Sequence, residues 1–125
     1  MATKGCVFCD RIRREEYDLT GFGAVSFEPL NPVTPGHRLF LPGRHVADAR
    51  EVGALTAPAA LAASWNRDWR NPNRGEDFNL ITSAGPAATQ TVFHLHLHYI
   101  PRWAGDGLRL PWTDQPALAA QGDGQ

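Results

Sequence analysis

Three histidines alternate with leucines late in the chain, in the run His94-Leu95-His96-Leu97-His98. Residues 92–100 are otherwise β-branched, aromatic or apolar, which predicts a strand. Side chains on a strand point alternately to its two faces, so we expect the three imidazoles on one face, about 7 Å apart, and the apolar side chains on the other. Neutral imidazole is a nucleophile and a metal ligand near pH 7, so the run predicts a reactive site.

Two other interpretations of this run are weaker. The first is a set of surface histidines or an expression tag. A tag would be terminal and unbroken, whereas this run is internal and alternates with core-type leucines. A non-haem iron site needs two histidines and a carboxylate. The strand contains no acidic residue, and the next one, Asp106, follows Pro101.

A second candidate site is the pair Cys6 and Cys9, the only cysteines in the chain. The Cys-x-x-Cys spacing indicates a metal site or a redox pair in a reducing compartment. The redox interpretation is the weaker of the two, because no thioredoxin-like βαβ pattern follows. The plain alternative is that both thiols are small buried apolar groups.

The bulk properties exclude several classes of protein. A chain of 125 residues fits one domain, and a net charge of -1 argues against extended nucleic acid or an anionic membrane as the main partner. No apolar run reaches the length of a membrane span and no signal peptide opens the sequence, so we expect a cytoplasmic protein. A small anionic ligand at a local site remains open.

The remaining pattern predicts the elements that position these residues. We expect a short charged helix over residues 10–16 and a long helix over 47–69, broken or restarted at Pro58. Apolar runs predict strands at 24–27, 37–41, 78–82 and 92–100, separated by turns at 31–36, 71–75 and 83–89. This order indicates an α+β fold, an antiparallel sheet with a helix on one face. We expect a domain over 1–112 and a flexible tail over 113–125.

These motifs together resemble the histidine triad (HIT) family. The resemblance is carried by Gln90-Thr91-Val92-Phe93-His94-Leu95-His96-Leu97-His98 with the following Tyr-Ile-Pro-Arg, by C-V-F-C at 6–9, by N-P-V-T-P-G-H at 31–37 and by L-P-G-R-H at 41–45. It spans residues 6 to about 102. It implies a five-stranded antiparallel sheet with helices, and a homodimer in which two sheets run together.

The resemblance also implies an activity. The expected substrates are dinucleoside polyphosphates, nucleoside phosphoramidates or nucleotidylated molecules. By matching positions, His96 is the nucleophile that forms a nucleotidyl-histidine, His98 hydrogen-bonds the phosphate, and Gln90 lies near the phosphate or leaving-group oxygens. Backbone N–H groups of residues 85–92 are expected to donate to the phosphate. His37, by contrast, is interpreted as a structural histidine satisfied by nearby backbone.

Some branches of the family hold a structural zinc, and all four of its ligand types are present here as Cys6, Cys9, His45 and His94. Four tetrahedral sulfur and nitrogen ligands suit zinc and make a closed, structural site. We expect this zinc to hold the N-terminal segment against the strand and to add folding free energy. No organic cofactor is expected.

The chain departs from the family pattern at nucleotide-binding positions. Pro29 stands where many members have the acidic residue that meets the ribose, with Glu28 one step earlier; a shift of one residue on a strand reverses the face. Thr89 replaces a common glycine before Gln90, and Ser83 replaces a common asparagine, whereas Asn79 is retained. We expect Asn79, Ser83 and Thr89 near the nucleotide. Apolar walls for the base are expected from Val7, Phe8 and Leu30.

Three functions are consistent with these observations. The first is a nucleotidyl hydrolase or transferase, favoured because the triad and Gln90 are intact. The second is a nucleotide-binding regulatory protein without turnover, which would more often have lost His96. The third, a metal-dependent oxygenase, requires a redox metal and a carboxylate ligand.

Overall fold

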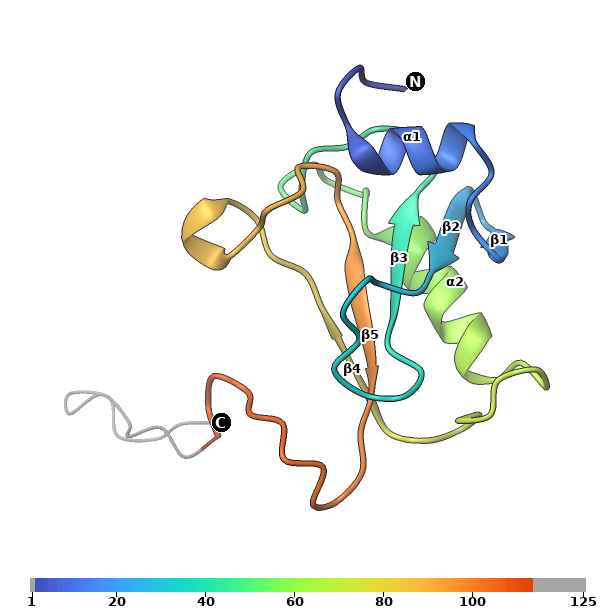
Figure 1. Cartoon of the computed structure of the whole chain (residues 1–125), viewed down its shortest axis with the longest axis vertical. Helices are drawn as coiled ribbons and strands as arrows, with labels where there is room; N and C mark the ends of the chain where they lie inside the picture. The colour runs from blue at the N-terminus through green and yellow to red at the C-terminus, as the bar shows by residue number, and fades with distance from the viewer. Residues whose placement is uncertain (1, 114–125) are drawn as a thin grey trace.

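Five strands form one antiparallel sheet in the order β1-β2-β3-β5-β4 (Figure 1). The structure, a computed structural model, describes residues 2–113. The strands are β1 (Leu19–Gly21), β2 (Ala24–Phe27), β3 (Arg38–Pro42), β4 (Phe78–Ile81) and β5 (Leu97–Pro101). With a main helix and a short N-terminal helix, this arrangement confirms the predicted α+β fold.

Each helix covers a different part of the sheet. Helix α2 (Thr56–Asn66) packs on one face, where the core includes Phe40, Leu61 and Tyr99. Helix α1 (Val7–Arg13) crosses one end of the sheet, where Phe8 joins a second core with residues of β2 and β3 (Figure 1). Every residue of β2 and β3 is buried because the two cores enclose both strands from opposite sides.

The strand register places one histidine in the row of side chains on the α1 face. Phe27 pairs with Leu39, Leu39 pairs with His98, and His98 pairs with Ile81. Residues that pair across neighbouring strands share a face of the sheet. The imidazole of His98 therefore extends the apolar row that Phe27 and Leu39 begin.

Both helices differ from their predicted bounds. The helix predicted over 10–16 begins earlier, because Cys6 caps it by accepting a hydrogen bond from the Cys9 N–H, 3.3 Å away. The helix predicted over 47–69 is shorter. Residues before Thr56 form turns, with Gly53 at φ +84°, and Pro58 lies in the first helical turn, where its missing N–H costs nothing.

The predicted strand over 92–100 is also shorter. Residues 92–96 form bends and irregular chain, and β5 begins only at Leu97. The N–H of Leu95 donates to Val46 in the loop after β3 rather than to a neighbouring strand. Strand β1, three residues long, was not predicted from the residue pattern.

Two other features bear on the predictions. Neither helix in residues 2–113 is long and apolar enough to cross a membrane.

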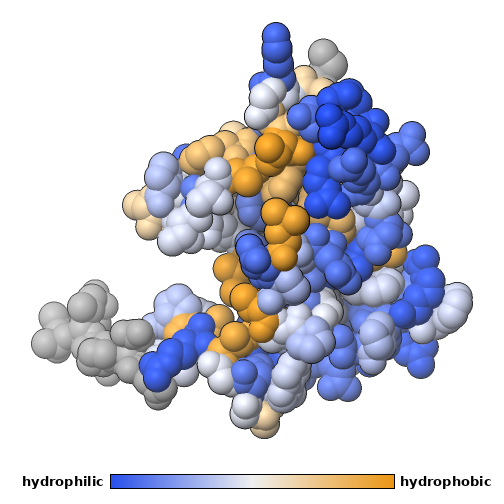
Figure 2. All heavy atoms as spheres, viewed as in Figure 1, coloured by the Kyte–Doolittle hydropathy of each residue, from blue (hydrophilic) through white to orange (hydrophobic). Residues whose placement is uncertain are grey.

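Figure 2 shows a hydrophilic surface over α1 and an apolar band down the middle of the same view. The predicted tail over 113–125 lies outside the described residues apart from Thr113.

Candidate active site and metal cluster

The three histidines of the run do not share one face, contrary to the prediction. His98 lies on β5, whereas His94 and His96 lie on the irregular segment before it. His94 is fully buried, and His96 and His98 are half-buried, with ring centroids 5.3 Å apart. The run therefore divides into one buried histidine and two neighbouring rings that remain partly accessible.

The ring of His96 is held in one orientation by the backbone. Its Nδ1 lies 2.8 Å from the carbonyl oxygen of His94, which can only accept a hydrogen bond. In the neutral ring Nδ1 therefore carries the proton, and Nε2 keeps its lone pair. Burial lowers the pKa of His96, which favours this neutral form. The ring of Phe8 packs edge-on against the imidazole, with the two ring centroids 5.2 Å apart.

A second chain of hydrogen bonds orients His98 in the opposite sense. The N–H of Val33 donates to His37 Nδ1 at 3.0 Å, so His37 Nε2 carries the proton of the neutral ring. That nitrogen lies 2.9 Å from His98 Nδ1 and donates to it. The remaining nitrogen of His98, Nε2, is consequently a donor. The pKa of His98 is lowered to about 4, mainly by burial and then by the neighbouring rings of His96 and His37.

The two accessible rings thus have complementary roles. His96 presents a lone pair, and His98 presents an N–H beside it. The prediction for His37 was incomplete: the ring does accept from backbone, but it also fixes the protonation of His98. These two residues are 61 positions apart, and only the pairing of β3 with β5 brings them together.

Four other predicted residues converge beside this pair. Ligand atoms of Cys6, Cys9, His45 and His94 all lie within 4.8 Å of one another. His94 Nδ1 is 3.5 Å from both sulfurs, and Cys9 Sγ is 3.4 Å from His45 Nδ1. His94 Nε2 donates to the Pro42 carbonyl at 3.0 Å, which leaves Nδ1 unprotonated toward the cluster. Two thiols and two imidazoles in this arrangement fit a tetrahedral zinc.

The side chain of Gln90 is occupied by backbone. It is 4% exposed, its oxygen accepts from the Gly85 N–H at 2.8 Å, and its nitrogen donates to Ala47 and Val92 carbonyls at 2.8 and 3.1 Å. Gln90 therefore clamps the turn that contains the 3₁₀ helix Pro86–Ala88. Thr89 ends this turn in the left-handed region at φ +73°, which a β-branched residue rarely adopts.

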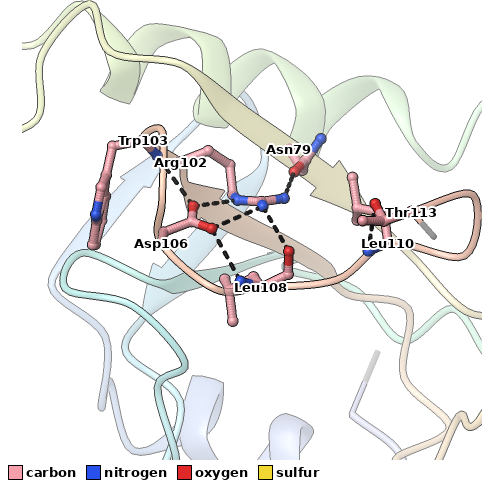
Figure 3. Close-up of polar contacts among 7 residues, drawn as sticks. All are labelled: Asn79, Arg102, Trp103, Asp106, Leu108, Leu110 and Thr113. Atoms are coloured by element: carbon pink, nitrogen blue, oxygen red, sulfur yellow. Dashed lines mark hydrogen bonds and ion pairs between the residues drawn. The ribbon is translucent and has the colours of Figure 1, made fainter.

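Asn79 is also occupied. Its Oδ1 accepts from Arg102 Nη1 at 2.7 Å, in the cluster that Arg102 forms with Asp106 after β5 (Figure 3). The structure thus ties the amide oxygen to the segment after β5, and the expected position of Asn79 near a nucleotide stays a prediction. Ser83 lies half-buried between β4 and the turn.

The three predicted base walls lie in different settings. Phe8 is buried and packs edge-on against Phe27, His94 and His96. Val7 is 55% exposed and Leu30 is 91% exposed. Phe8 is therefore the buried one of the three, and its ring packs against the histidines of the site.

Comparison with known proteins identifies the family. A family model described as the HIT domain matches residues 23–105. The chain belongs to the HIT family. This confirms the resemblance inferred from the histidine run. The family includes hydrolases, phosphorylases and nucleotide-binding proteins.

Two curated relatives and one solved structure are informative. This HIT protein is 33% identical over 119 residues to Adenylylsulfatase HINT3 of Arabidopsis thaliana, covering 83% of this chain and 58% of the relative. It is 33% identical over 97 residues to the AP-4-A phosphorylase of Mycobacterium tuberculosis, covering 74% of this chain and 50% of that protein. The chain therefore spans only about half the length of these relatives.

The solved structure is a Zn-bound histidine triad family protein from Mycobacterium smegmatis. It matches with a TM-score of 0.72 at 29% identity, covering 90% of this chain and 84% of that one.

Proposed function

We propose that this HIT protein transfers nucleotidyl groups to water or another acceptor through a covalent intermediate on His96. The observation that carries the proposal is the opposite protonation of two adjacent rings, a lone pair on His96 Nε2 and a donor on His98 Nε2. A phosphoryl centre needs both a nucleophile and a donor for its oxygens.

The reaction has two balanced steps. His96 Nε2 attacks the α-phosphorus, the bond from phosphorus to the leaving group breaks, and the leaving group departs with the bonding electron pair, taking a proton from solvent where it is an amine. Water then attacks the same phosphorus and loses one proton to solvent. The phosphorus–nitrogen bond breaks with its electron pair returning to His96 Nε2, and the nucleoside monophosphate is released. His98 donates to a phosphate oxygen in both steps. Dividing one difficult displacement into two is the gain of covalent catalysis.

Other residues support the substrate. Gln90 acts by holding the turn over residues 85–92, with Ser83 and Thr89 beside it. The N–H groups of Gly85, Ala88, Thr89 and Gln90 are bonded within this turn, so donation to the phosphate falls to the other N–H groups of the segment. Phe8 forms a wall for the nucleoside, with Val7 and Leu30 at its outer rim. The expected substrates are nucleoside phosphoramidates, dinucleoside polyphosphates and adenylyl sulfate-like molecules. The names of the two relatives support an adenylyl-type substrate class.

We further propose that Cys6, Cys9, His45 and His94 hold a structural zinc, which the Zn-bound relative supports. When bound, zinc supplies four closed coordination bonds and no open position. The chain's own contribution is to fix α1 through Cys6 and Cys9. We propose a reducing, cytoplasmic location, in which thiols at this spacing remain available as ligands.

A homodimer is also part of the proposal. Strand β4 is an edge of the sheet, and Leu80 on it is 38% exposed. An unpaired edge with an apolar side chain favours addition of another strand, here from a second copy. Light scattering of the purified protein measures the molecular mass and so tests this assembly.

Intact-protein mass spectrometry tests the activity. Wild type and His96→Ala are each mixed with adenosine or guanosine 5′-phosphoramidate and sampled within seconds. We expect a transient nucleotidyl adduct and released nucleoside monophosphate with wild type only. Nucleotide binding by His96→Ala serves as the control for folding. Binding without adduct or product in wild type would instead support the alternative, a regulatory protein without turnover.

A further inference from the structure

A pocket lies between the N-terminal segment and the segment that leads into the histidine run. Its volume is about 450 Å³, and its walls come from residues 3–7, residues 91–93 and His45. Pockets of this size hold small molecules in many proteins. Neither His96 nor His98 is among its walls, so the pocket is distinct from the histidine pair.

The polar side chains of this pocket suit an anion. Lys4, the only lysine in the chain, is exposed on one wall, and its ammonium has no hydrogen bond or ion pair within residues 2–113. The hydroxyls of Thr3 and Thr91 lie on the same walls, and no acidic residue lines the pocket. A cation and two hydroxyls without an acidic neighbour favour a ligand that carries negative charge.

The pocket also presents an aromatic ring. Phe93 lies on the wall opposite Lys4 in the sequence of lining segments, and its side chain is 47% exposed. Its ring makes no contact with another ring among the described residues. A free aromatic face near a cation is a platform on which a nucleobase stacks while its phosphates meet the charge. The pocket therefore suits a nucleotide better than an inorganic anion.

Two relationships place this pocket next to the nucleophile. Val92 on its wall packs against the core cluster that includes Phe8, and Phe8 lies edge-on to His96 at 5.2 Å. Phe93 precedes His96 by three residues, so their Cα atoms are at most about 11 Å apart. A substrate with its α-phosphate at His96 therefore reaches the pocket when a second nucleotide extends from that phosphate.

We propose that this pocket binds the second nucleotide of a dinucleoside polyphosphate, the half that leaves when His96 attacks the first. The inference rests on the proposed function, because the α-phosphate must lie at His96. Phe93 stacks with the second base, and Lys4 pairs with the phosphates of the leaving half. The bond from the α-phosphorus to the bridging oxygen breaks, and that oxygen departs with the electron pair. Lys4 stabilises the negative charge that the leaving half gains.

A simple phosphoramidate does not use this pocket. Its leaving group, ammonia after uptake of a proton, has neither a base nor a phosphate. Only interactions with the leaving half distinguish the two kinds of substrate when their first halves are identical. The ratio of kcat/KM for diadenosine tetraphosphate to kcat/KM for adenosine 5′-phosphoramidate therefore reports on the pocket alone.

The test measures this ratio in wild type and four variants. We expect it to fall about fivefold in Lys4→Met, as for one exposed charge pair, and about tenfold in Phe93→Leu, as for one stacked base. Arg13→Met and Phe22→Leu are the matched controls, since both side chains are exposed and neither lines the pocket. Both controls should keep the wild-type ratio. Turnover of the phosphoramidate shows in each case that the variant is folded.

A binding measurement extends the test to a protein without turnover. Reductive ¹³C-methylation labels Lys4 as the only lysine side chain and keeps its charge. On His96→Ala saturated with AMP, added ATP should shift the NMR signal of Lys4 until it reaches a plateau.

The outcomes separate the pocket from the proposed function. A ratio within twofold of wild type in Lys4→Met or in Phe93→Leu, or a Lys4 signal that ATP does not move, would overturn the pocket assignment. If the phosphoramidate is turned over and the tetraphosphate is not, the pocket assignment fails while the proposed function stands. If neither is turned over but ATP moves the Lys4 signal, the proposed function fails and the pocket is still a nucleotide site.

Discussion

The Nδ1 of His96 lies 2.8 Å from the backbone carbonyl of His94. The side chain of His94 meanwhile lies in the cysteine–histidine cluster, with its Nδ1 3.5 Å from the sulfurs of Cys6 and Cys9. One residue therefore contributes a candidate metal ligand through its ring and orients the candidate nucleophile through its backbone. The position of the cluster and the protonation of His96 are linked by this single residue.

Loss of the cluster should therefore affect both metal content and stability. We expect Cys6→Ser combined with Cys9→Ser to abolish zinc binding and to lower the melting temperature by about 5 °C or more, because α1 loses its coordination bonds. Elemental analysis and thermal unfolding measure the two effects. Arg13→Ala, an exposed change on the same helix, should alter neither. Unchanged metal content and melting temperature in the cysteine variant would remove the zinc assignment.

His37 should act on the reaction through His98. The change His37→Phe keeps a ring in the buried position but removes the donor that faces His98 Nδ1. We expect kcat/KM for a nucleoside phosphoramidate to fall by roughly tenfold to a hundredfold, because His98 no longer holds its proton on Nε2 in every molecule. Long-range ¹H–¹⁵N NMR of the imidazoles should show His98 as a mixture of tautomers.

Val33→Ala is the matched control for this experiment. The N–H that donates to His37 belongs to the backbone and is retained, and the Val33 side chain is 53% exposed. Turnover and the His98 tautomer should therefore stay at wild-type values. A His37→Phe enzyme with wild-type kinetics would show that His98 orients its proton without this partner.

Much of the architecture could be predicted from local patterns, but the site depended on tertiary contacts. The apolar runs at 24–27 and 78–82 became β2 and β4, and Pro101 ends β5 as a residue without an N–H should. The strand predicted from periodicity over residues 92–96 was wrong, because the N–H of Leu95 bonds to Val46 in the loop after β3 instead of to a strand. The alternation of histidine and leucine alone could not distinguish His94, whose ring points into the cysteine–histidine cluster, from His98, which lies on strand β5.

The roles of individual side chains were still harder to predict. Gln90 and Asn79 carry amides that suit a ligand, yet the structure binds one to backbone and the other to Arg102. The motif at 31–37 did not reveal the role of His37, because its partner His98 is 61 positions away and only the pairing of β3 with β5 brings the two together.

Histidine titration supplies a prediction on pH. The pKa of His98 is lowered from 6.5 to about 4, first by burial and then by His96 and His37. Between these values the unfolded chain takes up a proton at this residue and the native protein does not. The contribution of His98 to stability is thus complete above pH 6.5 and is progressively lost as the pH falls toward 4.

Two measurements check this behaviour. Urea unfolding gives the free energy of unfolding of wild type and of His98→Gln. We expect the value for wild type, relative to that of His98→Gln, to be smaller at pH 5 than at pH 7.5, because glutamine does not titrate. NMR of the His98 ring should show a neutral imidazole in the native protein at pH 5.5. An ordinary titration of His98 near pH 6.5 would contradict the burial argument.

The ion pair between Arg102 and Asp106 should hold the segment after β5 in place. Arg102 donates through Nε and Nη2 to the two oxygens of Asp106, at 2.7 and 3.0 Å, and through Nη1 to Asn79 on β4 (Figure 3). Asp106 also accepts from the backbone N–H of Trp103 and of Leu108. These bonds, Arg102 foremost, hold the pKa of Asp106 well below its usual range.

We expect Arg102→Met to release this segment while the sheet stays folded, since the sheet core lies elsewhere. Trypsin should then cleave at Arg109 several-fold faster, with little change in melting temperature, because local opening and global unfolding are separate events. Arg102→Lys keeps the charge but loses the bidentate contact, so its cleavage rate should lie between those of wild type and Arg102→Met. Arg74→Met, in an exposed loop between α2 and β4, is the control and should leave cleavage at Arg109 unchanged. Equal rates in wild type and Arg102→Met would mean that other contacts hold the segment.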